Sequence, residues 1–247
     1  MKKDLNVKIE LDFNSLKYNF DNKLITSSNS VLLGNELINS YKNSKQFNNE
    51  PRFSNLPFYI EEYSKSIEIF NNWIILKGFE DIVSALNELL VSINYIIEFN
   101  KRIKDIKIGE LIKDFHQLAW QDYDKISKPH FPELIKRVEN YLGKLECKKE
   151  LFSINKARNC LVHRKGIVDI NDFNMNNALI VQWWQFEYSK IKDIQRKEII
   201  YFKKENRKSK EKIFNKGESI NFTLQEYIEF VIFAQSVSYE ILNKFIK

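Results

Sequence analysis

The sequence predicts a mainly α-helical protein with a small antiparallel β insertion before its last helix. Only 6 Gly and 4 Pro occur among 247 residues, too few for the many turns of an all-β fold. Hydrophobic residues make up 43% and aromatic residues 14%, enough to bury a sizeable core without disulfides or a structural metal. Apolar residues recur at helical spacing over long stretches, whereas β-branched and aromatic residues gather near the C-terminus.

Residues 1–56 are predicted to form a leader that lies outside the main domain. Apolar residues alternate from Leu5 to Phe13, which is a strand pattern. An Asn- and Ser-rich stretch follows, and a short helix is predicted over residues 31–44. The leader contains no motif that indicates a chemistry.

The main helical domain is predicted to span residues 57–247. From Pro57, a favoured first-turn residue, helical periodicity continues through a long apolar segment with a candidate interruption near Asn71 or Gly78. Two further helices are predicted, one over residues 110–126 and one that begins at Phe131. Whether the last of these breaks or continues into the next segment stays open.

The β insertion is predicted at about residues 177–222 and contains about three strands. The strand-like segments are "ALIVQWWQFEYSKI", "EIIYFKKE" and "IFNKGESINFT", the last with a hairpin turn. Trp183 and Trp184 point to opposite faces of a strand, so one of them could be exposed for base stacking, although core packing is favoured. Thr223 and Glu226 then form a capping box that opens the last helix.

Charge and cysteine content are compatible with a cytoplasmic protein that binds an acidic partner, although a Lys- and Asn-rich composition also arises from AT-rich coding. The net charge is +6 and the isoelectric point is near 9.0, which suits RNA or DNA. The densest basic run, residues 203–212, is predicted to be a solvated loop. No secretory signal or membrane span is predicted, Cys147 and Cys160 are expected to be buried reduced thiols, and the spacing of the histidines argues against a metal site.

The segment "KARNCLVHRKGIVD", residues 156–169, carries the strongest functional pattern. On a helical wheel its apolar residues mark the side that faces the core: Ile154, Ala157, Cys160 and Leu161. Asn159 and His163 then fall together on the opposite side, and Arg158 lies at the border with a side chain long enough to reach the histidine. Three polar groups therefore converge on a surface that the core does not need.

This convergence has a chemical and a structural interpretation. A histidine is titratable near neutral pH, and the cations around His163 suit a phosphate. In the alternative interpretation, Arg158 and His163 only cap the end of a helix that stops at Gly166, and Asn159 is solvated.

The order of residues in "RNCLVH" resembles the signature of the HEPN superfamily, in which an Arg is followed after four to six residues by His and commonly has a polar residue directly after it. The long preceding helix "GFEDIVSALNELLVSI" and the closing helix are similar to that family as well. The likeness covers roughly residues 70–247 and implies a HEPN-like antiparallel helical bundle. The β insertion would be an elaboration of this lineage.

Many HEPN proteins are metal-independent endoribonucleases. The resemblance therefore implies that this protein cleaves RNA without a metal and acts as a toxin or an anti-phage defence effector. It implies RNA as the substrate, no cofactor and no metal. It also implies a homodimer, in which two motif helices meet across a two-fold axis and form a composite site. An antitoxin or a defence-system partner is expected as well.

The resemblance also implies roles for the motif residues. The 2′-hydroxyl would attack the adjacent phosphate and leave a 2′,3′-cyclic phosphate and a 5′-hydroxyl. His163 would transfer a proton, Arg158 would stabilise charge on the phosphate, and Asn159 would orient the histidine or the phosphate. Three neighbouring cations would hold flanking phosphates: Lys156, Arg164 and Lys165.

Two other classes of function remain open. The chain could be a non-catalytic HEPN-like module that binds RNA, a nucleotide or a partner protein. It could also be a helical scaffold whose dimerisation surface contains polar groups by coincidence. Acidic residues on the long helix are predicted to form an exposed stripe without a catalytic role: Glu80, Asp81 and Glu88.

Overall fold

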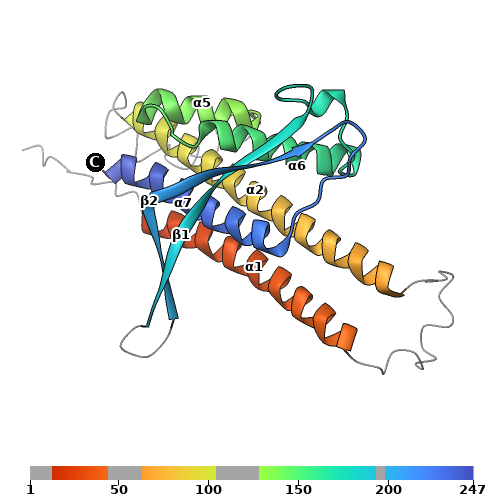
Figure 1. Ribbon diagram of the computed structural model, residues 1–247. Helices are drawn as coiled ribbons and strands as arrows, with labels where there is room; N and C mark the ends of the chain where they lie inside the picture. Colours follow the sequence, from red (N-terminus) through yellow and green to blue (C-terminus); the bar gives the residue numbers. More distant parts are fainter. Residues whose placement is uncertain (1–12, 44–62, 104–127, 193–197, 247) are drawn as a thin grey trace, which may run out of the picture.

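A computed structural model describes most of the chain, and it is mainly helical (Figure 1). The described residues are 13–43, 63–103, 128–192 and 198–246. The helices are α1 (Phe13–Asn43), α2 (Tyr63–Ile103), α5 (Phe131–Leu142), α6 (Lys148–Arg164) and α7 (Leu224–Ile246), and the strands are β1 (Leu179–Lys192) and β2 (Glu198–Phe214). The predicted fold class, a mainly α protein with a small antiparallel sheet before the last helix, is confirmed.

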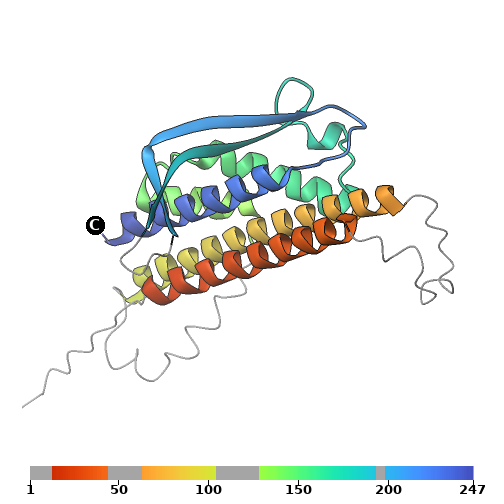
Figure 2. The same ribbon diagram turned by 60° about the horizontal axis from the view of Figure 1, so that its bottom comes forward.

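Helices α1 and α2 lie side by side and antiparallel (Figure 2). The prediction of a short helix over 31–44 was wrong in length, because α1 already begins at Phe13. This largely polar segment forms a helix because buried positions recur every three or four residues: Phe20, Leu24, Ser27, Val31, Gly34 and Ile38. α1 thus packs in one core with α2 and α7. The alternating pattern before Phe13 lies outside the described residues.

Helix α2 passes through Asn71 and Gly78 without the predicted interruption. A Cβ atom at Gly78 would lie 2.4 Å from Cγ2 of Val31 on α1 and 2.7 Å from Cε2 of Tyr227 on α7. At the same crossing, the hydroxyls of Ser27 and Tyr227 are 3.1 Å apart, within hydrogen-bond distance. The glycine is therefore needed for the close approach of three helices, not for a turn.

Replacing Gly78 with Ala should lower the free energy of unfolding by about 1 to 2 kcal/mol. The substitution gains helix propensity, but it forces Val31 and the Tyr227 ring out of well-packed positions. Gly34→Ala is the matched control, because its Cβ meets only the flexible end of Ile74. Urea denaturation should show Gly34→Ala unchanged or slightly stabilised; equal effects at both glycines would contradict the packing argument.

Among the described helices, α2 alone is long and apolar enough to cross a membrane by length and composition. The segment is Ile67–Lys101, and 56% of its most apolar window is buried inside the protein. This burial is consistent with the core helix of a soluble protein.

The sequence left open whether the helix that begins at Phe131 continues into the motif segment. In the structure it ends before α6 begins, so α5 and α6 are separate helices. Gly143 adopts a positive φ of 81° and ends α5. Glu139 then stabilises the connection: its carboxylate accepts a hydrogen bond from the Leu145 N–H at 3.2 Å and pairs with Lys148. The helix predicted at 110–126 lies outside the described residues.

Strands β1 and β2 form an antiparallel two-stranded sheet that crosses α6 and α7 (Figure 1). Leu179 pairs with Phe214, and the register shifts once, between Phe186 and Tyr188. The basic run at 203–212 was predicted to be a loop, but it belongs to β2. Because one strand runs through it, the described sheet has two strands rather than about three.

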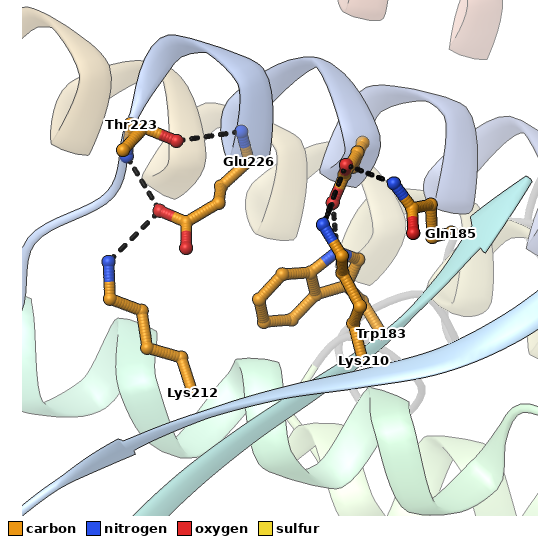
Figure 3. Close-up of polar contacts among 7 residues, drawn as sticks. Trp183, Gln185, Lys210, Lys212, Thr223 and Glu226 are labelled. Atoms are coloured by element: carbon orange, nitrogen blue, oxygen red, sulfur yellow. Dashed lines mark hydrogen bonds and ion pairs between the residues drawn. The ribbon is translucent and has the colours of Figure 1, made fainter.

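The two tryptophans of β1 are both buried, which confirms core packing. Trp184 donates its indole N–H to Glu150 of α6 at 2.9 Å, and Trp183 donates to Glu229 of α7 at 2.8 Å. Lys210 of β2 also reaches Glu229, at 3.0 Å (Figure 3). The sheet is therefore joined to both helices through buried carboxylates.

The predicted capping box at the start of α7 is confirmed. The Glu226 N–H donates to Oγ1 of Thr223 at 3.1 Å, and the Thr223 N–H donates to the Glu226 carboxylate at 2.7 Å (Figure 3). Lys212 of β2 pairs with the same carboxylate at 3.0 Å. The cap therefore also ties the sheet to the start of the helix.

Candidate functional site

Helix α6 carries the "RNCLVH" motif and is fixed from behind by β1. The Gln182 N–H donates to Oγ of Ser153 at 2.8 Å, and that hydroxyl lies 3.2 Å from the Gln182 carbonyl oxygen. Glu150, one turn earlier, accepts the indole N–H of Trp184. These contacts hold one side of α6 against the sheet and leave the opposite side, with the motif, facing outward.

The C-terminal end of α6 closes as the sequence predicts, at Gly166. Lys165 is left-handed with φ 54°, Gly166 has φ 77°, and the Gly166 N–H donates to the Cys160 carbonyl at 3.1 Å. The Ile220 N–H donates to the Gly166 carbonyl at 2.8 Å. The segment predicted as a third strand therefore pairs with the end of the motif helix, through an isolated bridge between Ile167 and Ser219.

Two of the three cations expected to hold flanking phosphates are engaged inside the protein. Arg164 forms a two-pronged ion pair with Asp172, whose side chain is 1% exposed. Lys156 donates to the backbone carbonyls of Asn171 and Phe173, at 3.3 and 2.7 Å. Lys165 is exposed. Phosphate binding by these residues stays a prediction, and two of them already anchor the segment after α6.

Burial and hydrogen bonding have opposite effects on the pKa of Asp172. Burial alone would raise the pKa of the carboxyl, but hydrogen bonds from Arg164 and from the Asp169 N–H hold its pKa below the usual range. The neighbouring Cys160 thiol has its pKa raised to about 11, chiefly by burial and then by the Asp172 charge. A reactive thiolate is therefore not expected at Cys160 near neutral pH.

Asp172→Asn should lower the free energy of unfolding by about 1 to 3 kcal/mol at pH 7, because it removes a charged partner from Arg164. A carboxyl whose folded pKa is depressed stabilises the fold above its unfolded pKa, about 3.9, and this contribution is lost as pH falls through the folded value. The difference between native protein and variant should therefore shrink below about pH 4. A difference that stays constant from pH 7 to pH 3 in urea titrations would contradict the assignment.

A cleft of about 760 Å³ opens where α2, α5 and α6 meet. From α2 it is lined by Val83, Ser84, Asn87 and Glu88. From α5 and the residues just before it come Pro129, His130, Phe131, Pro132, Glu133 and Lys136, and from α6 come Asn155, Arg158 and Asn159. Its volume is in the range of small-molecule sites.

The structure brings together two of the three predicted catalytic residues. Arg158 and Asn159 both line the cleft, and Nη1 of Arg158 lies 3.4 Å from Oδ1 of Asn159. His163 is exposed in the last turn of α6 and is not among the lining residues. Within one protomer, the arginine and the asparagine therefore share a site from which the histidine is separate.

The ionic groups of the cleft leave positive charge without a partner. Glu88 pairs with Lys23 of α1, and Glu133 lies 3.4 Å from Arg137. Arg158 and Lys136 form no ion pair with any residue that the structure describes. An anion such as a phosphate could neutralise both cations.

Local sequence patterns indicated no role for several of the cleft residues, among them His130, Lys136 and Asn155. The "HFPE" pattern does place His130 at the start of a helix, because Pro132 suits the first turn. No local pattern could place that helix start beside Arg158, because the two are joined only through the packing of α5 on α2 and α6. Asn155 fits the outward stripe of α6 and would have been found by extending the wheel one turn back.

Comparisons with known proteins add no relative to this picture. No family model matches the chain, and no curated protein or solved structure matches it. The motif of α6 and the geometry of the cleft are therefore the basis for a functional proposal.

Proposed function

We propose that this protein is a metal-independent endoribonuclease of the HEPN type, acting in the cytoplasm as a toxin or an anti-phage effector. The observation that carries the proposal is the position of Arg158, which is half-buried in a cleft beside Asn159 and has no described carboxylate partner. An arginine that only capped its helix would be satisfied by the last carbonyls or by a neighbouring acid. One aimed at an open cleft suits a phosphate.

In the proposed reaction the ribose 2′-oxygen forms a bond to the adjacent phosphorus, and the bond from phosphorus to the 5′-oxygen breaks. A single histidine, His163, accepts the 2′-hydroxyl proton and then donates a proton to the leaving 5′-oxygen. The products are a 2′,3′-cyclic phosphate and a 5′-hydroxyl. Arg158 stabilises the negative charge that grows on the phosphate oxygens, and Asn159 positions the arginine or the phosphate.

A homodimer would bring this histidine to the cleft. His163 is exposed on the outward side of α6, and Val162 beside it is 44% exposed, so an apolar group and a titratable group share this surface. A two-fold axis through the surface would set each motif against its counterpart and add His163 of the partner subunit to the cleft that holds Arg158. A separate antitoxin or a defence-system partner would control the activity.

The test is to incubate the purified protein with total RNA in excess chelator and to map the new ends. Cyclic-phosphate and 5′-hydroxyl ends made by the native protein, and not by folded His163→Ala protein, are the expected result. Ends of another chemistry, or equal cleavage by the variant, would contradict the assignment of His163.

One observation favours a second candidate, a module that binds RNA or a nucleotide without cleaving it. His163 does not line the cleft that contains Arg158, so a single protomer offers an anion site without its proposed proton-transfer group. Tight RNA binding without cleavage, by a protein shown to be a dimer, would favour this candidate over the enzyme.

A further inference from the structure

The inner wall of the α2–α5–α6 cleft contains an asparagine that the fold does not use. Asn155 is 9% exposed, lines the cleft and forms no hydrogen bond with another described residue. Most buried polar groups are paired within the protein, whereas the amide atoms of Asn155 remain accessible from the cleft, where a ligand can reach them. Its neighbour Ser153, on the sheet side of α6, shows the usual case, since its hydroxyl is bonded to Gln182.

Helix α2 adds further polar groups to the same cleft. Ser84 and Asn87 line it, and neither side chain is hydrogen-bonded to another described residue. Together with Asn155 they provide hydroxyl and amide donors and acceptors from two different helices. Such groups match the donor and acceptor edges of a nucleobase or the hydroxyls of a ribose.

The unpaired cations lie in the same cleft as these amides. Arg158 projects from α6 and Lys136 from α5, and the two carboxylates that line the cleft, Glu88 and Glu133, are paired elsewhere. A ligand that carries an anion and a polar heterocycle would satisfy both sets of groups. A nucleotide has this composition, and a cleft of about 760 Å³ can hold one.

We propose that the α2–α5–α6 cleft is a nucleotide subsite for single-stranded RNA, with a backbone phosphate on Arg158 and Lys136 and a base edge on the Asn155 amide. The identity of the ligand as RNA rests on the proposed function. The subsite itself lies within one protomer and needs no dimer. It would select the nucleotide next to the cleaved bond.

The first arm of the test replaces the unused amide with an apolar group of similar size. Binding is measured by fluorescence anisotropy with a labelled 2′-fluoro RNA decamer of mixed sequence, which lacks the attacking hydroxyl. Asn155→Leu should weaken binding about tenfold. The same variant should melt near the native temperature, because the amide that it removes forms no hydrogen bond with another described residue. A purely structural asparagine would instead give a lower melting temperature with unchanged binding, which would overturn the proposal.

The second arm tests the phosphate contact through its salt dependence. Lys136→Ala should lower the slope of log affinity against log salt concentration by about 0.7, the value for one contact to a single strand. Lys149→Ala is the matched control, because Lys149 is an exposed lysine of α6 outside the cleft. Equal slopes for the two lysine variants would overturn the phosphate assignment. Lys136 is exposed, so this variant is expected to fold even if Asn155→Leu does not.

Two further readouts separate the proposals and the source of the phosphate. If the native protein never cleaves RNA but both cleft variants weaken decamer binding, the subsite stands and the ribonuclease proposal fails. If the native protein cleaves RNA and neither variant changes binding, the subsite is overturned and the ribonuclease stands. Adenosine, cytidine, guanosine and uridine monophosphates serve as competitors: displacement of the decamer at micromolar concentrations would identify a free nucleotide as the ligand and overturn the assignment to RNA.

Discussion

Arg158→Ala and His163→Ala should each lower the rate of RNA cleavage by about 10²- to 10⁴-fold. Neither should change the free energy of unfolding by more than about 0.5 kcal/mol. The reason is that both side chains do little for the fold: Arg158 makes one long hydrogen bond to its neighbour Asn159, and His163 is exposed. Single-turnover cleavage of a defined RNA, beside urea unfolding of the same preparations, measures both quantities.

Mixing the two inactive variants tests the composite site. If Arg158 of one subunit acts with His163 of the other, a mixed dimer contains one intact pair, and activity should return to about a quarter of the native rate after subunit exchange. If both residues act within one protomer, the mixture stays inactive and the composite site is rejected. Lys149→Ala serves as the control, because it removes a positive charge from α6 outside the cleft.

Local patterns in the sequence predicted the elements whose structure is decided locally. The capping box at Thr223, the helix end at Gly166 and the core side of α6 are all set by contacts within a few residues, and all three were confirmed. The prediction of a solvated loop at 203–212 was wrong, because a run of charged residues usually indicates a segment exposed to solvent. In the structure Lys210 and Lys212 are paired with carboxylates of α7, so the strand can continue through them.

The sequence pattern of α6 alone could not predict which other elements line the cleft. The wheel placed Asn159 on the outward side of α6 and Arg158 at its border, and both residues line the cleft. It could not show that the start of α5 lies opposite, which brings in His130 and Lys136 from more than 20 residues away. Nor could it show that His163 lies outside the cleft, because that depends on how α2 and the start of α5 pack against α6. The separation of His163 from Arg158 is the reason that the proposed chemistry needs a second subunit.

Glu229→Ala should lower the free energy of unfolding by about 3 kcal/mol. Glu229 is 3% exposed and accepts hydrogen bonds from three side chains of the sheet, namely Trp183, Gln185 and Lys210, at 2.8 to 3.2 Å (Figure 3). Removing the carboxylate leaves the buried indole N–H and the lysine charge without a partner. Urea denaturation followed by tryptophan fluorescence reports the loss directly.

The control for Glu229 is Glu187, which bonds Asn206 and Lys208 across the same two strands but is mostly exposed. Glu187→Ala should cost less than about 1 kcal/mol, because water replaces the lost contacts. The network also bears on function, since Trp184, next to Trp183 on β1, donates to Glu150 of the motif helix. Loosening the sheet from α7 should therefore weaken RNA binding in the cleft at temperatures well below unfolding. If Glu229→Ala lowers stability and leaves binding intact, the sheet supports the fold without positioning α6.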